Sequence, residues 1–296
     1  MPKLLLFDAF SLIYRAFFAI RILTGPEGQP VNALYGFVRM TRKILADHHP
    51  THAAVVFDLG APQYRLAILP SYKGQRPPTP PDLENQLPII REFVRAMGLP
   101  LVEIEGEEAD DLIGTLAVAA AQDGADTLIV SSDKDFMQLV GSHIRLLRPD
   151  AKDAGICDEA GVEARFGVRP DQMLDYLCLV GDSVDNIPGV PGVGEKTAVA
   201  LLRRYGSLAN LLTSLDTLDK PKLRASISAA TAQLQTNRRL IGLRCDVSLP
   251  AHWNELILQP EDSVRLAALY RACGFKSLLA EVEKSSQQTP DLFAGF

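Results

Sequence analysis

Short apolar runs, each followed at once by acidic residues, recur in the first half of the chain. They cover residues 3–7 before Asp8, 53–57 before Asp58, and 127–130 before a segment that contains Asp133 and Asp135. Uninterrupted apolar runs of this length are typical of strands that are buried on both faces. Each run is therefore predicted to be a strand of a parallel sheet, with acidic residues at its carboxyl end.

Amphipathic stretches separate these runs, and the helices expected between the strands cover residues 33–47, 83–97 and 107–122. Strands that alternate with helices predict an α/β fold with a largely parallel central sheet flanked by helices. No strand pattern is found after about residue 155, where helices are expected at 162–166, 171–180, 196–205, 223–234 and 263–273. The predicted organisation is an α/β core over 1–170, a helical subdomain over 171–284 and a flexible polar tail over 285–296.

Composition narrows the class of protein. Of the 296 residues, 47% are hydrophobic and 22% are charged, which excludes a disordered tail or a fibre. The four cysteines include no C-x-x-C pair, so neither a zinc site nor a disulfide framework is expected. The apolar run at residues 3–7 is too short for a signal peptide or a membrane span. We therefore expect a soluble cytoplasmic protein without a membrane partner.

Charge is unevenly distributed around a net value of −6. Residues 102–185 carry 19 acidic and 6 basic side chains, whereas residues 196–244 carry 9 basic and 2 acidic ones. Such a layout is expected where carboxylates hold metal ions and their neighbours hold a polyanion. Two solvated faces of opposite charge would give the same totals, so charge alone does not decide between these interpretations.

Carboxylates at the strand ends give the strongest chemical signal. In open α/β sheets ligands bind beyond the carboxyl ends of the strands, so these acidic residues are expected to share one crevice. Further acidic residues that could join them are Glu108, Asp110, Asp111, Asp182 and Asp185. For the first three the simpler interpretation is stabilisation of a helix N-terminus, and for the last two it is a helix stop and cap. Crowded like charges repel one another unless cations neutralise them, and ligands that are all oxygen suit Mg²⁺ or Mn²⁺.

A glycine-rich turn precedes an expected helix in the second half of the chain. The glycines and the first helical residues are Gly189, Gly192, Gly194, Lys196 and Thr197. Small residues let backbone N–H groups approach a phosphate, and a helix N-terminus favours an anion. Glu195 interrupts the spacing that a Walker A loop requires. The pattern indicates a helix-hairpin-helix, which holds the backbone of a duplex without reading bases; a plain turn between helices is the weaker alternative.

The long connection over residues 62–81 combines basic, aromatic and proline side chains. Its basic and aromatic residues are Tyr64, Arg65, Tyr72, Lys73 and Arg76. Loops of this length are usually functional or disordered, and aromatic stacking with cationic contacts suits a single nucleic-acid strand. Tyr14 and Arg15 lie on the helix expected after Asp8. Core packing is the default for the aromatic residue there, but Arg15 beside an acidic pocket would pair with a phosphate.

As a set, these motifs resemble the bacterial 5′-3′ exonuclease domain of DNA polymerase I, within the flap endonuclease family. They run in family order over about residues 3–275: Asp8 with Tyr14-Arg15-Ala16, Val56-Phe57-Asp58, Tyr72-Lys73-Gly74-Gln75-Arg76-Pro77, residues 107–111, residues 132–135 and residues 181–198. Ala9 stands where the family usually has glycine, a departure expected to shift the site little. The chain shows no polymerase module, so we expect a free-standing nuclease or one whose polymerase is a separate product.

The resemblance implies a PIN-like nuclease core with an arch over residues 62–95, followed by the helix-hairpin-helix. It implies a first metal ion held by Asp8, Asp58, Glu108, Asp110 and Asp111, and a second held by Asp133, Asp135, Asp182 and Asp185. The residues implied near the scissile phosphate are Arg15, Tyr72, Lys73 and Arg76. The implied DNA contacts are Tyr14, Arg65, Gly189, Gly192, Gly194, Lys196 and Thr197. A K⁺ ion on main-chain oxygens of the hairpin is implied as well.

The predicted function is a structure-specific 5′-3′ exonuclease and 5′-flap endonuclease that uses two metal ions in replication and repair. Its expected partners are DNA with 5′ flaps, nicks or free 5′ ends, RNA-DNA hybrids, and a separate polymerase and ligase, in the nucleoid. An aspartyl phosphatase would need Asp-x-Asp after the first strand, but position 10 is Phe10. A non-catalytic DNA-junction binder needs only the hairpin and the basic block, and leaves the acidic residues unexplained.

Overall fold

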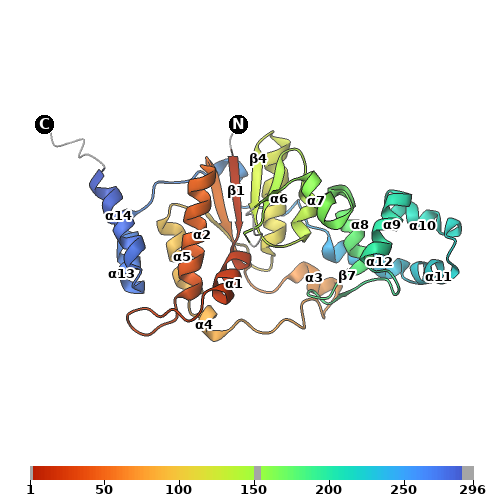
Figure 1. The fold of residues 1–296 in the computed structure, drawn as a ribbon, viewed down its shortest axis with the longest axis horizontal. Helices are drawn as coiled ribbons and strands as arrows, with labels where there is room; N and C mark the ends of the chain where they lie inside the picture. The colour runs from red at the N-terminus through yellow and green to blue at the C-terminus, as the bar shows by residue number, and fades with distance from the viewer. Residues whose placement is uncertain (1–2, 150–154, 289–296) are drawn as a thin grey trace.

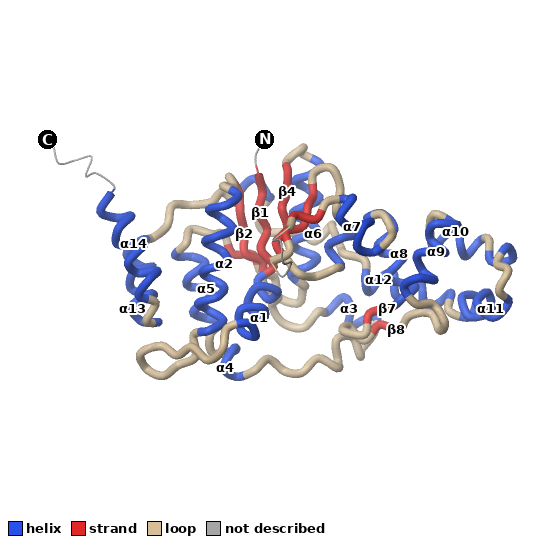
Figure 2. The backbone as a smooth tube through the Cα atoms, viewed as in Figure 1, coloured by secondary structure: helices blue, strands red, loops and turns tan. Residues whose placement is uncertain are grey.

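A six-stranded sheet lies at the centre of this computed structural model, which describes residues 3–149 and 155–288 (Figures 1 and 2). Its strands are β1 (Lys3–Asp8), β2 (His52–Val56), β3 (Leu101–Val102), β4 (Asp126–Val130), β5 (Ile144–Leu147) and β6 (Ile156–Cys157). Their order is β3-β2-β1-β4-β5-β6; the first five are parallel and β6 is antiparallel to β5. The predicted largely parallel sheet is confirmed.

The sheet separates two hydrophobic cores. Leu4 and Leu6 of β1 belong to the core that includes α6 (Ala109–Gln122). Leu5 and Phe7 belong to the core that includes α1 (Ala9–Ala19), α2 (Asn32–His48) and α5 (Leu87–Ala96). Because successive side chains of a strand point to opposite faces, a strand covered on both faces needs apolar residues at consecutive positions. This explains the uninterrupted apolar run, and the run stops where Asp8 reaches the edge of the sheet.

The connection from β2 to β3 contains α3 (Gln63–Ile68), α4 (Pro81–Glu84) and α5. Figure 1 shows the chain between α3 and α4 as a separate span along the lower edge of the molecule. The helix expected over 83–97 is in fact α4 and α5, because Pro88 fits only the first turn of a helix. The arch predicted over 62–95 is also too long, since Ile90 and Phe93 of α5 are fully buried in the core.

Helices dominate the chain after β6. They are α7 (Glu159–Phe166), α8 (Pro170–Val180), α9 (Glu195–Tyr205), α10 (Leu208–Thr213), α11 (Pro221–Ala229) and α12 (Thr231–Ile241), with the 3₁₀ turns η2 (Leu215–Thr217) and η3 (Trp253–Glu255). A further 3₁₀ turn, η1 (Asp135–Leu139), lies earlier, between β4 and β5. The single helix expected over 223–234 is wrong, because the chain breaks at Ala230 between α11 and α12. The hairpin strands β7 (Gly181–Asp182) and β8 (Ile187–Pro188) are too short to leave a sequence pattern. None of the helices in the described ranges has the length and apolar character that a membrane crossing requires.

The last two helices, α13 (Ser263–Cys273) and α14 (Lys276–Gln288), return to the α/β core. They lie beyond α5, at the opposite end of the molecule from α10 and α11 (Figure 1). Tyr270 and Leu278 are buried in the same core as α1, α2 and α5. The expected helical subdomain over 171–284 is therefore interrupted by this return. Helix α14 also continues through residues 285–288 of the expected tail, whereas 289–296 lie outside the described residues.

Candidate metal and nucleic-acid site

A crevice opens at the carboxyl edge of the sheet, where the strand ends were predicted to gather acidic residues. Its volume is about 560 Å³, and the carboxylates that line it are Asp8, Asp58, Glu107, Glu108, Asp110 and Asp133. Three of them come from the ends of β1, β2 and β4, and the other three lie at the N-terminus of α6, where Glu107 pairs with Arg244. Segments far apart in the sequence therefore bring carboxylates to one place, as the parallel topology predicts.

Hydrogen bonds from the surrounding chain hold two of these carboxylates in place. Asp8 caps α1: its Oδ1 accepts from Ser11 N at 3.2 Å, and its Oδ2 accepts from Ser131 Oγ at 2.6 Å. Asp58 Oδ1 accepts from Ala109 N at 3.0 Å and so links the end of β2 to the start of α6. A cation would thus meet carboxylates that are already oriented by the scaffold.

Burial and mutual repulsion raise the pKa values of the clustered carboxylates. Burial raises the pKa of Asp8 to about 7, although the bond from Ser131 opposes the shift and neighbouring carboxylates add to it. Burial, followed by the charge of Asp133, holds the pKa values of Asp110 and Asp135 well above the usual value for aspartate. When ionised, such a cluster carries an excess of negative charge that a cation would neutralise. The donor set of the crevice therefore fits a bound cation.

A second carboxylate group adjoins the first. Oxygens of Asp135, Asp182 and Asp185 all lie within 4.8 Å of one another. Asp135 Oδ1 is buried without a hydrogen-bond partner, and Asp135 N donates to Asp133 Oδ1 at 2.8 Å, which joins the two groups. Lys134 Nζ lies 3.0 Å from Asp182 Oδ2. This group of three carboxylates, with one oxygen of Asp135 left without a partner, fits a hard divalent cation, because such ions prefer oxygen ligands.

The structure corrects the predictions for Asp111 and Arg65. The Arg65 guanidinium bonds the two carboxylate oxygens of Asp111 at 2.8 and 2.6 Å and Glu108 Oε2 at 2.5 Å. Arg65 is 3% exposed and Asp111 is 1% exposed. Glu108 and Asp111 do share a face of the first helical turn, as their spacing predicts. Glu108 also lines the crevice, together with Asp110, whereas Asp111 does not. Asp111 is thus a buried ion-pair partner instead of a metal ligand, and Arg65 has no surface for DNA.

The basic side chains of the arch reach the carboxylates. Lys73 Nζ lies 2.5 Å from Glu108 Oε1, and Arg76 Nη2 lies 2.5 Å from Asp185 Oδ1. Burial disfavours the charge on Lys73, but Glu108 and other carboxylates outweigh it and raise the pKa of Lys73. Tyr72 is buried, and its hydroxyl donates to Asp185 Oδ2 at 3.1 Å. Lys73 and Arg76 are therefore charged at the margin of the crevice, where an incoming phosphate would meet them.

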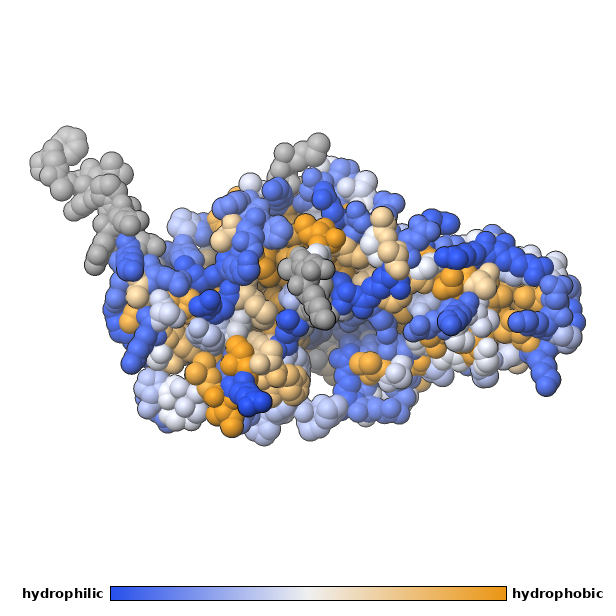
Figure 3. Space-filling view, in the orientation of Figure 1, coloured by the Kyte–Doolittle hydropathy of each residue, from blue (hydrophilic) through white to orange (hydrophobic). Residues whose placement is uncertain are grey.

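Aromatic side chains form a ladder along α1 that leads away from the crevice. Phe10 packs edge-on against Phe57 and lies 6.1 Å from Tyr14 between ring centroids, and Tyr14 stacks on Phe18 at 6.2 Å. Phe18 is 74% exposed and Ile22 is 93% exposed. Figure 3 shows apolar side chains gathered on the surface near α1 and the loop that follows it. The ladder thus joins the crevice to an exposed apolar patch, and neither Phe18 nor Ile22 was singled out from the sequence.

The three glycines between α8 and α9 are required for different structural reasons. A Cβ on Gly189 would lie 2.1 Å from a backbone carbonyl oxygen of α8, so close backbone packing requires glycine there. Close packing accounts for this glycine, and its contact with a phosphate stays a prediction. Gly192 has φ of +82° in an exposed turn, and Gly194 is the N-cap of α9. Lys196 is exposed and Thr197 half-buried in the first turn of α9, so the N-terminus of this helix is the part that can meet a phosphate.

Family models match nearly the whole described chain. Residues 3–167 match the 5′-3′ exonuclease, N-terminal resolvase-like domain, and residues 168–264 match the 5′-3′ exonuclease, C-terminal SAM fold. The chain belongs to the 5′-3′ exonuclease family.

Relatives within the 5′-3′ exonuclease family differ in length. The chain is 37% identical to a 5′-3′ exonuclease of Aquifex aeolicus, over 97% of this chain and 98% of the relative. It is 40% identical to DNA polymerase I of Bacillus caldotenax, over 97% of this chain and 33% of the relative. The chain therefore spans about a third of the length of the DNA polymerase I relatives.

Solved structures with low sequence identity share the exonuclease fold. A bacteriophage T5 flap endonuclease, solved with DNA and metal ions, has a TM-score of 0.71 at 18% identity and covers 97% of this chain and 100% of its own. The catalytic core of Rad2, solved with a DNA substrate, has a TM-score of 0.62 at 16% identity and covers 95% of this chain and 92% of its own. The PIN-like core followed by a helical domain is thus confirmed as the fold.

Two residues of this exonuclease-family site escaped the sequence analysis. They are Ser131, which donates to Asp8, and Lys134, which pairs with Asp182. Both belong to the segment 131–135 that directly follows β4, so their position at the strand end was the available signal. Arg15, which was predicted to lie near the phosphate, is half-buried on α1, and its side chain makes no hydrogen bond or ion pair among the described residues.

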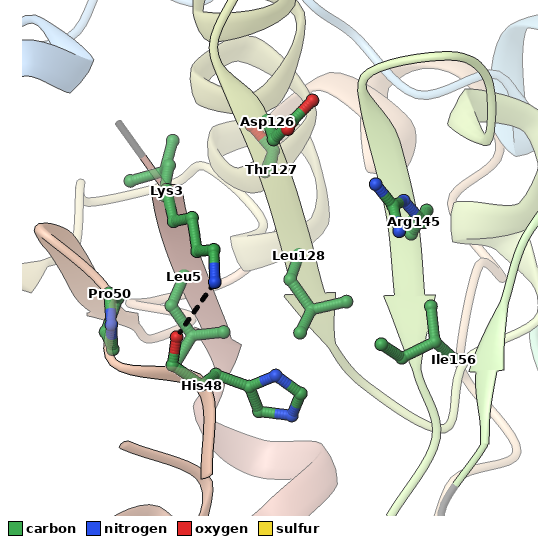
Figure 4. A pocket seen from close by; sticks show the side chains of 10 residues that line it. Lys3, Leu5, His48, Pro50, Asp126, Thr127, Leu128, Arg145 and Ile156 are labelled. Carbon is green, nitrogen blue, oxygen red and sulfur yellow. Dashed lines mark hydrogen bonds between the residues drawn. The ribbon is translucent and has the colours of Figure 1, made fainter. Parts of the chain in front are cut away.

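A smaller cavity of about 140 Å³ lies at the opposite, amino edge of the sheet (Figure 4). Its lining includes Lys3, His48 and Arg145 around the apolar side chain of Leu128. Lys3 Nζ is 3.5 Å from His48 O, the contact drawn in Figure 4. Asp126 is the one carboxylate among its lining residues, so this cavity lacks the acidic cluster that marks the exonuclease-family site.

Without divalent cations, the stability of the protein is expected to fall as the pH rises. Asp8 has a usual pKa of 3.8, whereas burial raises its pKa in the folded protein to about 7. The folded state thus binds protons more tightly than the unfolded state, so this stabilisation is complete below about pH 4 and is lost as the pH passes 7. We expect a lower Tm in EDTA at pH 8 than at pH 6, and a smaller difference in Asp8→Asn. An equal or higher Tm at pH 8 would contradict the raised pKa.

Proposed function

We propose that this protein is a structure-specific 5′-3′ exonuclease and 5′-flap endonuclease that hydrolyses DNA with two divalent cations. These cations are Mg²⁺ ions, for which Mn²⁺ can substitute. The observation that carries the proposal is the convergence of two carboxylate groups, joined through Asp133 and Asp135, around a buried oxygen without a partner. Family membership and a relative of matching length named 5′-3′ exonuclease support it. A non-catalytic DNA-junction binder would require none of these carboxylates.

The two groups divide the cation ligands between them. One cation would be held by Asp8, Asp58, Asp110 and Asp133, and the other by Asp135, Asp182 and Asp185. When bound, such cations lower the pKa of a coordinated water and neutralise charge on the attacking and leaving oxygens. Glu108 is engaged by Arg65 and Lys73, so we assign it to holding Lys73 in place.

Lys73 and Arg76 supply positive charge from the other side of the phosphate. Both lie at the margin of the crevice. Arg76 would be released when its partner Asp185 binds a cation, whereas Lys73 would act from the place where Glu108 holds it. Both would stabilise the charge that develops on the phosphate oxygens. Attack by water would form a new bond to phosphorus and break the bond between phosphorus and the 3′ oxygen. The 3′ oxygen would take up a proton, so the products are a 5′-phosphate and a 3′-hydroxyl. Arg15 would complete the proposed phosphate environment, and the buried Tyr72 would act on it through its hydrogen bond to Asp185.

Geometry instead of base sequence would select the substrate. The N-terminus of α9, with Gly192, Gly194, Lys196 and Thr197, would hold a duplex backbone, and a K⁺ ion on hairpin carbonyls would reinforce it. The displaced 5′ strand would pass under the span between α3 and α4. Tyr14 and the exposed Phe18 would stack on bases at the junction. The T5 flap endonuclease and the Rad2 core, which share this fold, were each solved with DNA, and this supports the binding of DNA.

The partners proposed for this activity are DNA with 5′ flaps, nicks or free 5′ ends, and RNA-DNA hybrids that carry primer remnants. A gap left by the nuclease must be filled and sealed, so we propose cooperation with a DNA polymerase and a ligase in the nucleoid. The longer relatives, named DNA polymerase I, support the link to a polymerase.

The test is cleavage of a labelled 5′-flap DNA in Mg²⁺ and in EDTA. We expect cutting at the junction in Mg²⁺ and a fall to background in EDTA, because the carboxylate cluster provides no reaction path without cations. DNA affinity, measured by fluorescence anisotropy in both buffers, should change much less. Binding without cleavage in either buffer would reject the nuclease and favour the junction binder.

A further inference from the structure

The part of the arch that carries Lys73 rests on the loop that carries Asp185. Residues 71–76 are called the arch base here, and residues 182–187 the acidic loop. Lys73 N donates to Asp185 O at 3.1 Å, a contact between backbones that are more than a hundred residues apart in sequence. Figure 2 shows the end of α3, just before the arch base, beside the β7-β8 hairpin that encloses the acidic loop.

The side chain of Asn186 spans these two segments. Its Nδ2 donates to Ser71 O at 3.0 Å, and its Oδ1 accepts from Gln75 Nε2 at 3.1 Å. Ser71 and Gln75 lie on either side of Lys73 in the arch base. One amide group thus holds the turn at both ends, and its donor and acceptor are both used.

The backbone at the centre of this turn is in a conformation that lysine disfavours. Lys73 has φ of 54° and Asn186 has φ of 60°, both in the left-handed region. Asparagine tolerates this region, whereas a lysine remains there only when surrounding contacts hold it. The bonds of Asn186 are among the contacts that hold it.

The acidic loop is also fixed to the glycine-rich turn before α9, which is proposed to hold the duplex. The two ends of the loop, Asp182 and Ile187, pair with each other in the β7-β8 ladder. The residues directly after it are held by α12: Asn237 Nδ2 donates to Pro188 O at 2.8 Å, and Gln233 Nε2 donates to Gly189 O at 3.1 Å. Asn186 therefore joins the arch base to the element that is proposed to hold the duplex.

We propose that Asn186 is a positioning residue, which sets the Lys73 ammonium relative to the carboxylates and couples it to the seating of the hairpin on DNA. The inference rests on the proposed nuclease function. Asn186 itself bonds the arch base and makes no contact with the crevice carboxylates through its side chain. Its effect on the reaction passes through Lys73.

The test is Asn186→Gly in the full chain. Glycine adopts the left-handed conformation without penalty, so this variant removes the side-chain bonds while preserving the backbone. We expect the single-turnover cleavage rate at saturating Mg²⁺ and flap DNA to fall roughly 10- to 100-fold, the size of effect that a small misplacement of a catalytic group produces. The Kd for flap DNA and the Tm should stay close to those of wild type. Val184→Ala is the matched control, because this side chain of the same loop is 61% exposed and should change nothing.

A double variant separates positioning from a general structural effect. In a Lys73→Ala background, Asn186→Gly should reduce the rate by no more than about twofold, because the group that it positions is already gone. A wild-type rate for Asn186→Gly would overturn the inference, and so would an equal loss in both backgrounds. If wild type and Val184→Ala fail to cut flap DNA, the proposed function fails as well. If both cut normally and Asn186→Gly also cuts at the wild-type rate, only the role of Asn186 is rejected.

Discussion

Asp110→Asn is expected to remove cleavage of 5′-flap DNA while leaving the fold at least as stable as that of wild type. The Asp110 carboxylate lines the crevice, and burial with the charge of Asp133 raises its pKa. A neutral amide relieves this repulsion but is a poorer ligand for a divalent cation. Single-turnover cleavage in Mg²⁺ should fall roughly 1000-fold, on the scale of losing one preorganised group at a reacting centre, while the Kd for DNA stays within about threefold of wild type.

The adjacent residue provides the matched control. Asp111→Asn makes the same chemical change one position along α6, but Asp111 faces Arg65 and does not line the crevice. Its main effect should be a lower Tm, with DNA cleavage retained by the molecules that remain folded. Wild-type cleavage by Asp110→Asn, or equal loss of cleavage with equal Tm in both variants, would contradict the assignment of the two faces.

Arg65→Met is expected to lower the free energy of unfolding by about 3–5 kcal/mol, the usual cost of breaking a buried ion pair by removing one partner. It would leave Asp111 buried without its cation and Glu108 with only Lys73 as a charged partner. It would also remove the bond from Arg65 Nε to Leu240 O at 2.7 Å, which links α3 to the end of α12. Urea unfolding followed by circular dichroism measures the change.

An exposed arginine serves as the control for Arg65. Arg169 pairs with Asp171 at 2.9 Å, but both side chains are more than half exposed, so Arg169→Met should change stability little. If the two variants unfold at the same urea concentration, Arg65 is not the structural centre that its burial indicates. A large loss confined to Arg65→Met would confirm it.

The parts of the site that were predictable follow from strand topology. Apolar runs that end in Asp8 and Asp58 sufficed to predict that their carboxylates meet, because parallel strands end at one edge. The segment 131–135 added Asp133 and Asp135 by the same argument. To place these carboxylates at one edge, it is enough to know that the strands are parallel. The alternation of apolar runs with amphipathic stretches predicts this.

The side chains that were misplaced depend on tertiary contacts that spacing does not encode. Spacing put Glu108 and Asp111 on one face of α6, which is correct, but it did not say whether that face meets the crevice or another residue. Arg65 looked like a DNA contact because it stands among basic and aromatic residues. Its partners lie 43 and 46 residues away, and further bonds come from the end of α12, so only the folded chain shows that it is buried.

The errors in the helical half have a similar cause. The break at Ala230 has no glycine or proline to signal it, and the apolar pattern continues across it. The return of α13 and α14 to the α/β core depends on Tyr270 and Leu278 finding the core of α1, α2 and α5. Amphipathic pattern predicts that such residues are buried, but not against which partner.

Anomalous scattering from crystals grown with Mn²⁺ tests the central claim most directly, since it locates bound divalent cations without relying on activity. The account predicts two strong peaks in wild type, one among Asp8, Asp58, Asp110 and Asp133 and one among Asp135, Asp182 and Asp185, and loss of the first in Asp110→Asn. Peaks elsewhere on the surface, with none at either carboxylate group, would contradict it.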